Sequence, residues 1–121
     1  MPVETPATPS SVMNRDTALA RMGGDERLLT QMAEFFLADA PALMRELHTA
    51  LQKGDARAAH HAAHSLKGLS ANFEALSAIA AAREIELLSK AGDTAGCASL
   101  IGRLDEEISR LTVALQTMLS E

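Results

Sequence analysis

Apolar residues recur every three or four positions along most of this chain, which is the spacing of amphipathic helices. The most regular stripe lies near the C-terminus and alternates steps of four and three: Cys97, Ile101, Leu104, Ile108, Leu111, Leu115 and Met118. Three more stripes precede it, starting near Leu29, Ala59 and Ala75. The pattern therefore predicts four long helices.

Glycine and aspartate mark where these helices should end and begin. Gly54 follows the first stripe and Gly92 the third, and a short helix before the first stripe should stop at Gly23-Gly24. Three aspartates stand directly after glycines and suit the N-cap position: Asp25, Asp55 and Asp93. The predicted helices run from about residue 14 or 16 to 22, from 25 to 54, from 55 to about 71–73, from about 75 to 91, and from 93 or 94 onward.

Two features interrupt this order. Pro41 lies inside the first long stripe, so we expect a kink or a break near Ala40. Residues 1–12 contain prolines with threonine and serine and show no periodicity. We expect them to form a flexible tail or the remnant of an interdomain linker, with the folded domain spanning residues 13–121.

The regular C-terminal stripe is compatible with two arrangements. A strict heptad can pair two chains in a coiled coil, but this one is only about three heptads long, and the three other amphipathic helices also need a partner. We therefore predict an all-α fold: one antiparallel up-and-down four-helix bundle with a short extra N-terminal helix, as a monomer.

Composition supports a small helical domain and excludes several classes of protein. With 121 residues, no Trp, no Tyr and three Phe, the interior must be filled by Leu, Ile, Met and Ala, which favours closely packed helices. No apolar run approaches the roughly 20 residues of a membrane span, and no secretory signal is present. The single cysteine, Cys97, favours a reducing compartment, so we expect a cytoplasmic protein. The net charge of −5, without a basic stripe, argues against nucleic acid as a partner.

An unusual set of side chains lies on the outward face of the helix after Asp55. At about 100° per residue, His64, Lys67 and Gly68 share one face, opposite the apolar stripe that contains Leu66. A neutral imidazole offers a nucleophilic nitrogen, and an ammonium group binds phosphoryl oxygens. Glycine inside a helix costs about 1 kcal/mol relative to alanine, so close approach of another molecule is one reason for its presence. The set indicates a site that holds a phosphoryl group and admits a partner.

These residues also resemble a known family. His64-Ser65-Leu66-Lys67-Gly68, with the following residues 69–73, resembles the histidine-containing phosphotransfer (HPt) domains of bacterial two-component phosphorelays, and so do segments 21–25, 35–41 and 91–93. The resemblance covers roughly residues 14–119. It implies that His64 accepts a phosphoryl group from the aspartate of one receiver domain and passes it to another. Family members often carry glycine where Glu74 stands, so the turn after the His64 helix departs from the family pattern.

The resemblance implies roles for four more residues. Lys67 would contact the phosphoryl oxygens, and Gly68 would leave room for the partner. Glu86 stands where family members carry a polar side chain that holds the inner nitrogen of the histidine, and Lys90 stands where a basic residue sometimes assists the phosphoryl group. The spacing alone leaves another interpretation open, a surface ion-pair ladder of Arg83, Glu86 and Lys90.

The same resemblance implies response-regulator receiver domains as partners, with a hybrid sensor kinase among them. It implies no cofactor of the chain's own, since Mg²⁺ would come with the acidic pocket of the receiver. The sequence lacks a Gly-rich nucleotide loop and is too short for an ATP-binding domain beside the bundle, so we expect a phosphohistidine carrier without autokinase activity rather than an enzyme. A stand-alone protein and a domain of a hybrid kinase both fit.

Two other functions stay open at this point. His60 and His64 are four residues apart, a spacing that can chelate zinc or nickel, but no third ligand shares their helix face. The second alternative is an interaction-only bundle that has lost phosphotransfer, although such a relative would be expected to lose one of His64, Lys67 and Gly68. Without a metal, His60 and His61 fit a solvated docking surface whose charge they tune.

Overall fold

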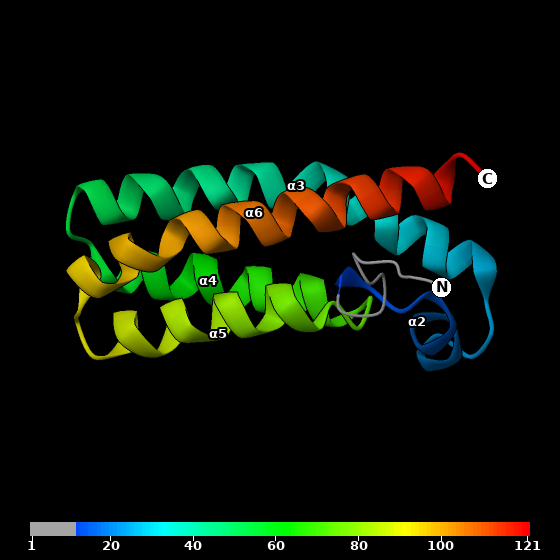
Figure 1. Ribbon diagram of the computed structural model, residues 1–121, viewed down its shortest axis with the longest axis horizontal. Coiled ribbons are helices and arrows are strands. Elements are labelled where there is room, and N and C mark those ends of the chain that lie inside the picture. The colour runs from blue at the N-terminus through cyan, green and yellow to red at the C-terminus, as the bar shows by residue number, and fades with distance from the viewer. Residues whose placement is uncertain (1–11) are drawn as a thin grey trace, which may run out of the picture.

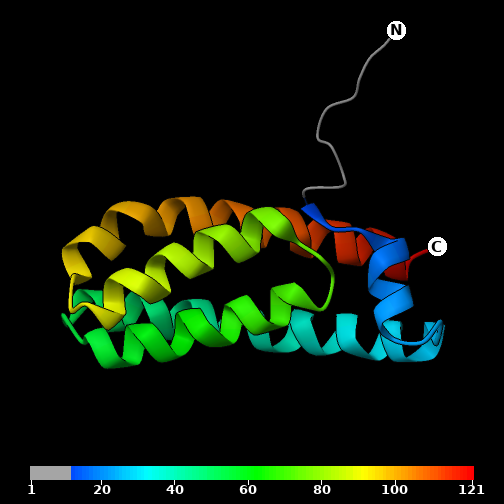
Figure 2. The same ribbon diagram turned by 90° about the horizontal axis from the view of Figure 1, so that it is seen from below.

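The computed structural model describes residues 12–121, so the expected tail lies, apart from its last residue, outside the described residues. Five helices fill the described part: α2 (Arg15–Arg21), α3 (Glu26–Gln52), α4 (Ala56–Ala71), α5 (Leu76–Lys90) and α6 (Thr94–Leu119). The four long helices lie side by side and alternate in direction, and α2 lies across one end of the bundle (Figures 1 and 2). The predicted four-helix bundle with a short extra N-terminal helix is confirmed.

The predicted helix ends are also confirmed. They could be predicted because capping residues close to each end define them. The side chains of Asp25, Asp55 and Asp93 each accept a hydrogen bond from the backbone N–H three residues on, at 3.1, 3.1 and 2.8 Å. Gly54 and Gly92 adopt φ angles of 67° and 83°, a region that glycine enters at little cost. Each cap is worth about 1 kcal/mol, so these residues fix where α3, α4 and α6 begin.

Of the kink or break expected near Ala40, the break does not occur. The 27-residue helix α3 continues through this residue, which lies exposed on its surface. Proline removes one backbone hydrogen bond and crowds the preceding turn. However, residues on both sides of it, among them Phe36, Ala40 and Leu47, are completely buried. Packing of both halves against the same core keeps the helix continuous.

The interior is filled largely by small side chains, as the composition suggested. The two helices that pack most extensively, α4 and α5, turn alanines inward, none of them more than 3% exposed: Ala59, Ala62, Ala63, Ala78, Ala81 and Ala82. Small side chains let two helix backbones approach closely. Larger side chains fill the end of the bundle, where Phe36 and Phe73 meet edge to face with ring centroids 6.0 Å apart. None of the helices in the described part combines the length and apolar character of a membrane-spanning helix.

Glu74, which stands where family members often carry glycine, lies in the turn between α4 and α5. This residue has a φ of 53°, in the left-handed region that favours glycine. Its carboxylate accepts a hydrogen bond from Arg21 at the end of α2, with Oε2 2.6 Å from Nη1. The backbone N–H of Asn14 also donates to the carbonyl of Phe73 at 2.9 Å. Thus α2 holds the turn that follows the His64 helix, and an ion pair accompanies the strained backbone.

We predict that this ion pair matters only while Glu74 is present. Arg21→Ala should lower the free energy of unfolding by about 0.5–1 kcal/mol in the wild type, the range of a well-formed surface ion pair. In a Glu74→Gly background, where glycine removes the backbone strain and the carboxylate, the same change should cost nothing measurable. Urea unfolding of the four variants measures this coupling.

Arg15→Ala is the matched control, since Arg15 also lies on α2 and makes only a 3.9 Å contact with Glu26. Its effect should be the same in both backgrounds. An equal loss from Arg21→Ala in the two backgrounds would contradict the proposed link between Arg21 and the turn.

Candidate functional site

His64 projects from the middle of α4 into solvent. Its side chain is 64% exposed, whereas its neighbours Ala63 and Leu66 are completely buried. The capped start of α4 and this buried stripe fix the direction in which the imidazole points. The structure therefore places the ring on the outward face, as the helical spacing predicted.

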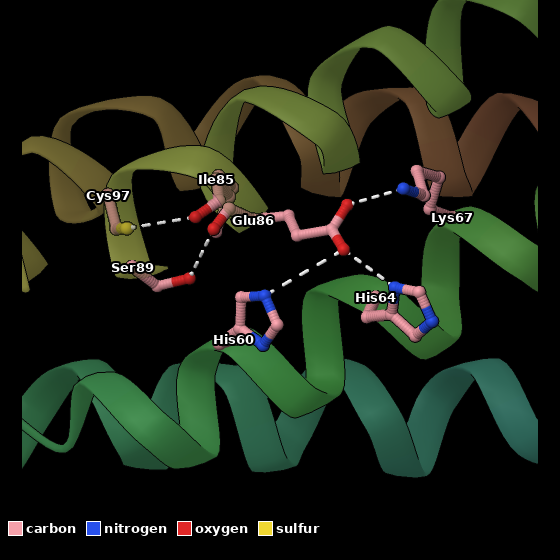
Figure 3. Close-up of polar contacts among 7 residues, drawn as sticks. All are labelled: His60, His64, Lys67, Ile85, Glu86, Ser89 and Cys97. Carbon is pink, nitrogen blue, oxygen red and sulfur yellow. Dashed lines mark hydrogen bonds and ion pairs between the residues drawn. The ribbon is translucent and has the colours of Figure 1, made fainter. Parts of the chain in front are cut away.

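Glu86, on α5, holds the inner nitrogen of this ring. Its Oε2 lies 2.6 Å from Nδ1 of His64 (Figure 3). Because an ionised carboxylate only accepts hydrogen bonds, Nδ1 must carry the proton and donate it. The lone pair of the neutral imidazole is then on Nε2, which points away from Glu86 toward solvent (Figure 3). One contact between two helices thus sets both the tautomer and the orientation of the ring.

Lys67 occupies the other oxygen of the same carboxylate. Its Nζ lies 2.6 Å from Oε1 of Glu86, one helical turn beyond His64. The lysine is 30% exposed and the glutamate only 12% exposed, so this pair is better shielded from water than an ordinary surface pair. Lys67 is therefore close enough to His64 to reach a group bound to Nε2, but in this structure its charge is bound to Glu86.

Gly68 lies on the same exposed face and has open space around it. A β-carbon built at this position would meet nothing within 4 Å. A neighbouring helix therefore does not require the missing side chain, which excludes the structural explanation for a glycine inside α4. What remains is access for another molecule to the ring of His64.

The structure does not bring Lys90 into contact with His64. Lys90 is exposed and lines a groove between α4 and α5 together with His60, Lys67 and Glu86. The alternative ion-pair ladder along α5 is not formed, because every ion pair that Glu86 makes among residues 12–121 runs to α4. Glu86 thus joins two helices, and its role as a ring-orienting residue stays a prediction with a fitting geometry.

Sequence reasoning missed one contact of this site. His60, one turn before His64, stacks on it with ring centroids 6.3 Å apart and planes 11° from parallel. Its Nε2 lies 3.8 Å from the same Oε2 of Glu86 that binds His64. As for the metal alternative, residues 12–121 contain no group of three or more histidine, cysteine or acidic side chains arranged to hold a metal ion.

Two opposing effects act on the carboxyl group of Glu86. Its burial alone would raise its pKa, but hydrogen bonds from Lys67 and His64, together with their charges, outweigh burial and hold the pKa below its ordinary value. A carboxyl group whose pKa is lower in the folded state stabilises the fold above its unfolded pKa, and this contribution is lost as the pH falls through the folded pKa.

We therefore predict that Glu86→Gln flattens the acid side of the stability profile. The wild type should lose stability as the pH falls below about 4.5, where Glu86 takes up a proton and releases its cationic partners. The variant lacks this proton uptake and should lose less between about pH 5 and pH 3. Melting temperatures by circular dichroism, with Glu84→Gln on the exposed side of α5 as the control, measure the difference. Parallel curves for wild type and Glu86→Gln would contradict the prediction.

Comparisons with known proteins agree with this geometry. The family model described as "Hpt domain" matches residues 31–114, which include all five proposed site residues. Histidine-containing phosphotransfer protein B (HptB) from Pseudomonas aeruginosa PAO1 is 26% identical and superposes with a TM-score of 0.82, over 93% of this chain and 96% of that one. The HPT domain of a sensor hybrid histidine kinase from Shewanella has the same fold, with a TM-score of 0.82, 22% identity and coverage of 91% and 95%.

A search of curated proteins gave no match. The family match nevertheless covers more than half of the chain and contains the histidine, the lysine and the glycine whose geometry is described above. The chain belongs to the Hpt domain family and has the histidine phosphotransfer role of that family in two-component phosphorelays.

Proposed function

We propose that His64 accepts a phosphoryl group from the aspartyl phosphate of one receiver domain and passes it to the aspartate of another. The observation that carries this proposal is the 2.6 Å contact between Nδ1 of His64 and Glu86. It leaves the lone pair on Nε2, and the 64% exposure of the side chain leaves that nitrogen open to a partner. His48, His60 and His61 lack a lysine three residues on and a glycine four residues on.

The transfer requires one bond to form and one to break. Nε2 attacks the phosphorus in line, an N–P bond forms, and the P–O bond to the aspartate breaks, which returns the aspartate to its carboxylate form. The imidazole keeps its proton on Nδ1 and becomes positively charged, and the adjacent Glu86 carboxylate stabilises that charge. The reverse sequence delivers the group to the next receiver.

Lys67 supplies the second electrostatic contribution. In the proposal its ammonium turns from Oε1 of Glu86 toward the transferred phosphoryl oxygens, where charge-assisted hydrogen bonds offset the developing negative charge. Lys90, on the rim of the same groove, adds positive charge at longer range. Mg²⁺ belongs to the acidic pocket of the receiver in this scheme, and the chain contributes no cofactor of its own.

The partners follow from the same chemistry. Receiver domains of response regulators, and of a hybrid sensor kinase, would dock over the His64 face around Gly68. The likeness to a domain of a sensor hybrid histidine kinase supports a kinase of this class as the source of the phosphoryl group. In this proposal the chain acts as a monomeric carrier in the cytoplasm, without autokinase activity.

Replacing the phosphoryl acceptor tests the proposal directly. His64→Gln should keep the helical fold, since the side chain lies outside the core, but should lose all phosphoryl label from a receiver domain charged with acetyl phosphate. Phosphorus-32 transfer followed by gel electrophoresis measures this, and the label in the wild type should be acid-labile and base-stable, as an N–P bond is. Undiminished label in His64→Gln, or label mapped to His48, His60 or His61, would refute it.

A side chain at Gly68 should block the partner without harming the fold. Gly68→Gln should stabilise α4 by about 0.5–1 kcal/mol, because a better helix former replaces glycine in open space. The same substitution should weaken receiver binding at least tenfold, as measured by titration calorimetry.

Gly102→Gln is the matched control, because Gly102 also lies inside a long helix, α6, and has open space around its α-carbon. It should give a similar gain in stability and leave receiver binding unchanged. Normal binding by Gly68→Gln would show that the gap does not serve the partner.

A further inference from the structure

Three side chains of α4 converge on the carboxylate of Glu86, and the proposed function uses only two of them. Lys67 contacts Oε1 and His64 contacts Oε2, both at 2.6 Å. The third is His60, whose Nε2 lies 3.8 Å from Oε2 and whose ring stacks on that of His64 (Figure 3). His60 therefore lies beside both the nucleophile and the group that orients it.

Glu86 loses its contact with Lys67 once His64 carries the phosphoryl group. Such a group bears close to two negative charges, so it attracts Lys67 more strongly than the single charge of Glu86 does. When Lys67 turns away, Oε1 loses its partner. Glu86 is only 12% exposed, and a largely buried carboxylate that loses a cationic partner gains from a new positive charge beside it.

We propose that His60 is a positioning residue that binds a proton when His64 is phosphorylated, and that it supplies at Oε2 of Glu86 the positive charge that Lys67 withdraws from Oε1. The proton comes from solvent and stays on the imidazole, which donates through Nε2 to the carboxylate of Glu86. A small rotation of the side chain converts the 3.8 Å separation into a hydrogen bond. No covalent bond changes at His60. Its effect is to keep Glu86 against Nδ1 of His64, so that the ring stays oriented for the return transfer.

The charges around His60 favour this order of events. The groove that His60 lines is positive before phosphorylation. It contains three cations, Lys67 on α4 with Arg83 and Lys90 on α5, and one carboxylate, Glu86 on α5. A proton on His60 would add a further positive charge to this groove. A phosphoryl group on the adjacent His64 adds about two negative charges, which the positive charge gained by the ring only partly offsets. The groove becomes less positive, so phosphorylation and proton binding favour each other.

No charge from α3 lines this groove. On α4 itself, Arg57 precedes His60 by three residues, and His61 and His64 are the nearest titratable neighbours in sequence. Arg45 and Glu46 of α3 line a different groove, together with His61 and two residues between α3 and α4, Lys53 and Asp55. His61 is the next residue of α4 and lines a groove without access to Glu86, which makes it a control for a histidine outside the site.

The sign of the pH dependence follows from the proton count. The phosphorylated protein binds one more proton than the unphosphorylated protein, so low pH favours phosphorylation of His64. This advantage should disappear as the pH rises through the range in which imidazoles lose their proton, about pH 6 to 8.

The test compares wild type, His60→Gln and His61→Gln in phosphoryl exchange with one receiver domain. The ratio of phosphohistidine to phosphoaspartate at equilibrium is measured from about pH 6 to about pH 8.5. Dividing the equilibrium constant of each variant by that of the wild type cancels the pH dependence of the receiver. For His60→Gln this quotient should be near one at pH 8.5 and should fall to about one tenth at pH 6. For His61→Gln it should stay near one throughout.

A quotient for His60→Gln that does not change with pH, or an equal fall for His61→Gln, would overturn the inference. The inference rests on the proposed function, and the two fail differently. A wild type that takes no label, or a His64→Gln variant that still takes it, overturns the proposed function itself.

A second measurement separates the contact with Glu86 from a general effect of phosphoryl charge. Imidazole nitrogen NMR at pH 7 should show His60 more protonated in the phosphorylated wild type than in the unphosphorylated protein. In Glu86→Gln, which removes the negative charge of the side chain, this difference should shrink severalfold. A difference of the same size in both proteins would show that His60 does not take the place of Lys67.

Discussion

The close packing of α4 against α5 is the constraint on which the rest of this molecule depends. Alanines line the inner sides of both helices, among them Ala63, Ala81 and Ala82, each nearly or completely buried. Because the two backbones can approach closely, a glutamate on one helix reaches a histidine and a lysine on the other, both at 2.6 Å. A larger side chain in this seam would separate the helices and break these contacts. The core and the chemistry are therefore set by the same interface.

Much of the fold is readable from the sequence because its signals are local. Asp25, Asp55 and Asp93 cap helices where the pattern of glycine and aspartate places them. Pro41 misleads because its local cost is outweighed by packing on both sides, which no local signal reports. A helix in a bundle contacts two neighbours, so its buried surface is wider than one apolar stripe and reaches Ser70 while leaving Leu69 partly exposed.

The candidate site also has one part that the sequence predicts and another that it does not. His64, Lys67 and Gly68 lie on one helix, so their spacing is enough to place them on one face. Glu86 comes from another helix, and only the family resemblance pointed to it, since the register between two helices depends on packing. The approach of His60 to Glu86 was missed for that reason. Glu74 shows the limit of a resemblance: the departure from glycine is visible in the sequence, but the left-handed backbone and its ion pair are not.

The exposure of His64 has a consequence for the direction of signalling. Although the ring of His60 stacks on it, the His64 side chain is 64% exposed, with open space nearby at Gly68. A carrier without a lid offers the same nitrogen to every receiver that can dock, whether that receiver is charged or empty. It therefore speeds donation and return alike and leaves the balance between them unchanged. The net direction of phosphoryl transfer is then decided by the concentrations of the receivers and the stabilities of their aspartyl phosphates. The bundle itself transfers the group equally well in both directions.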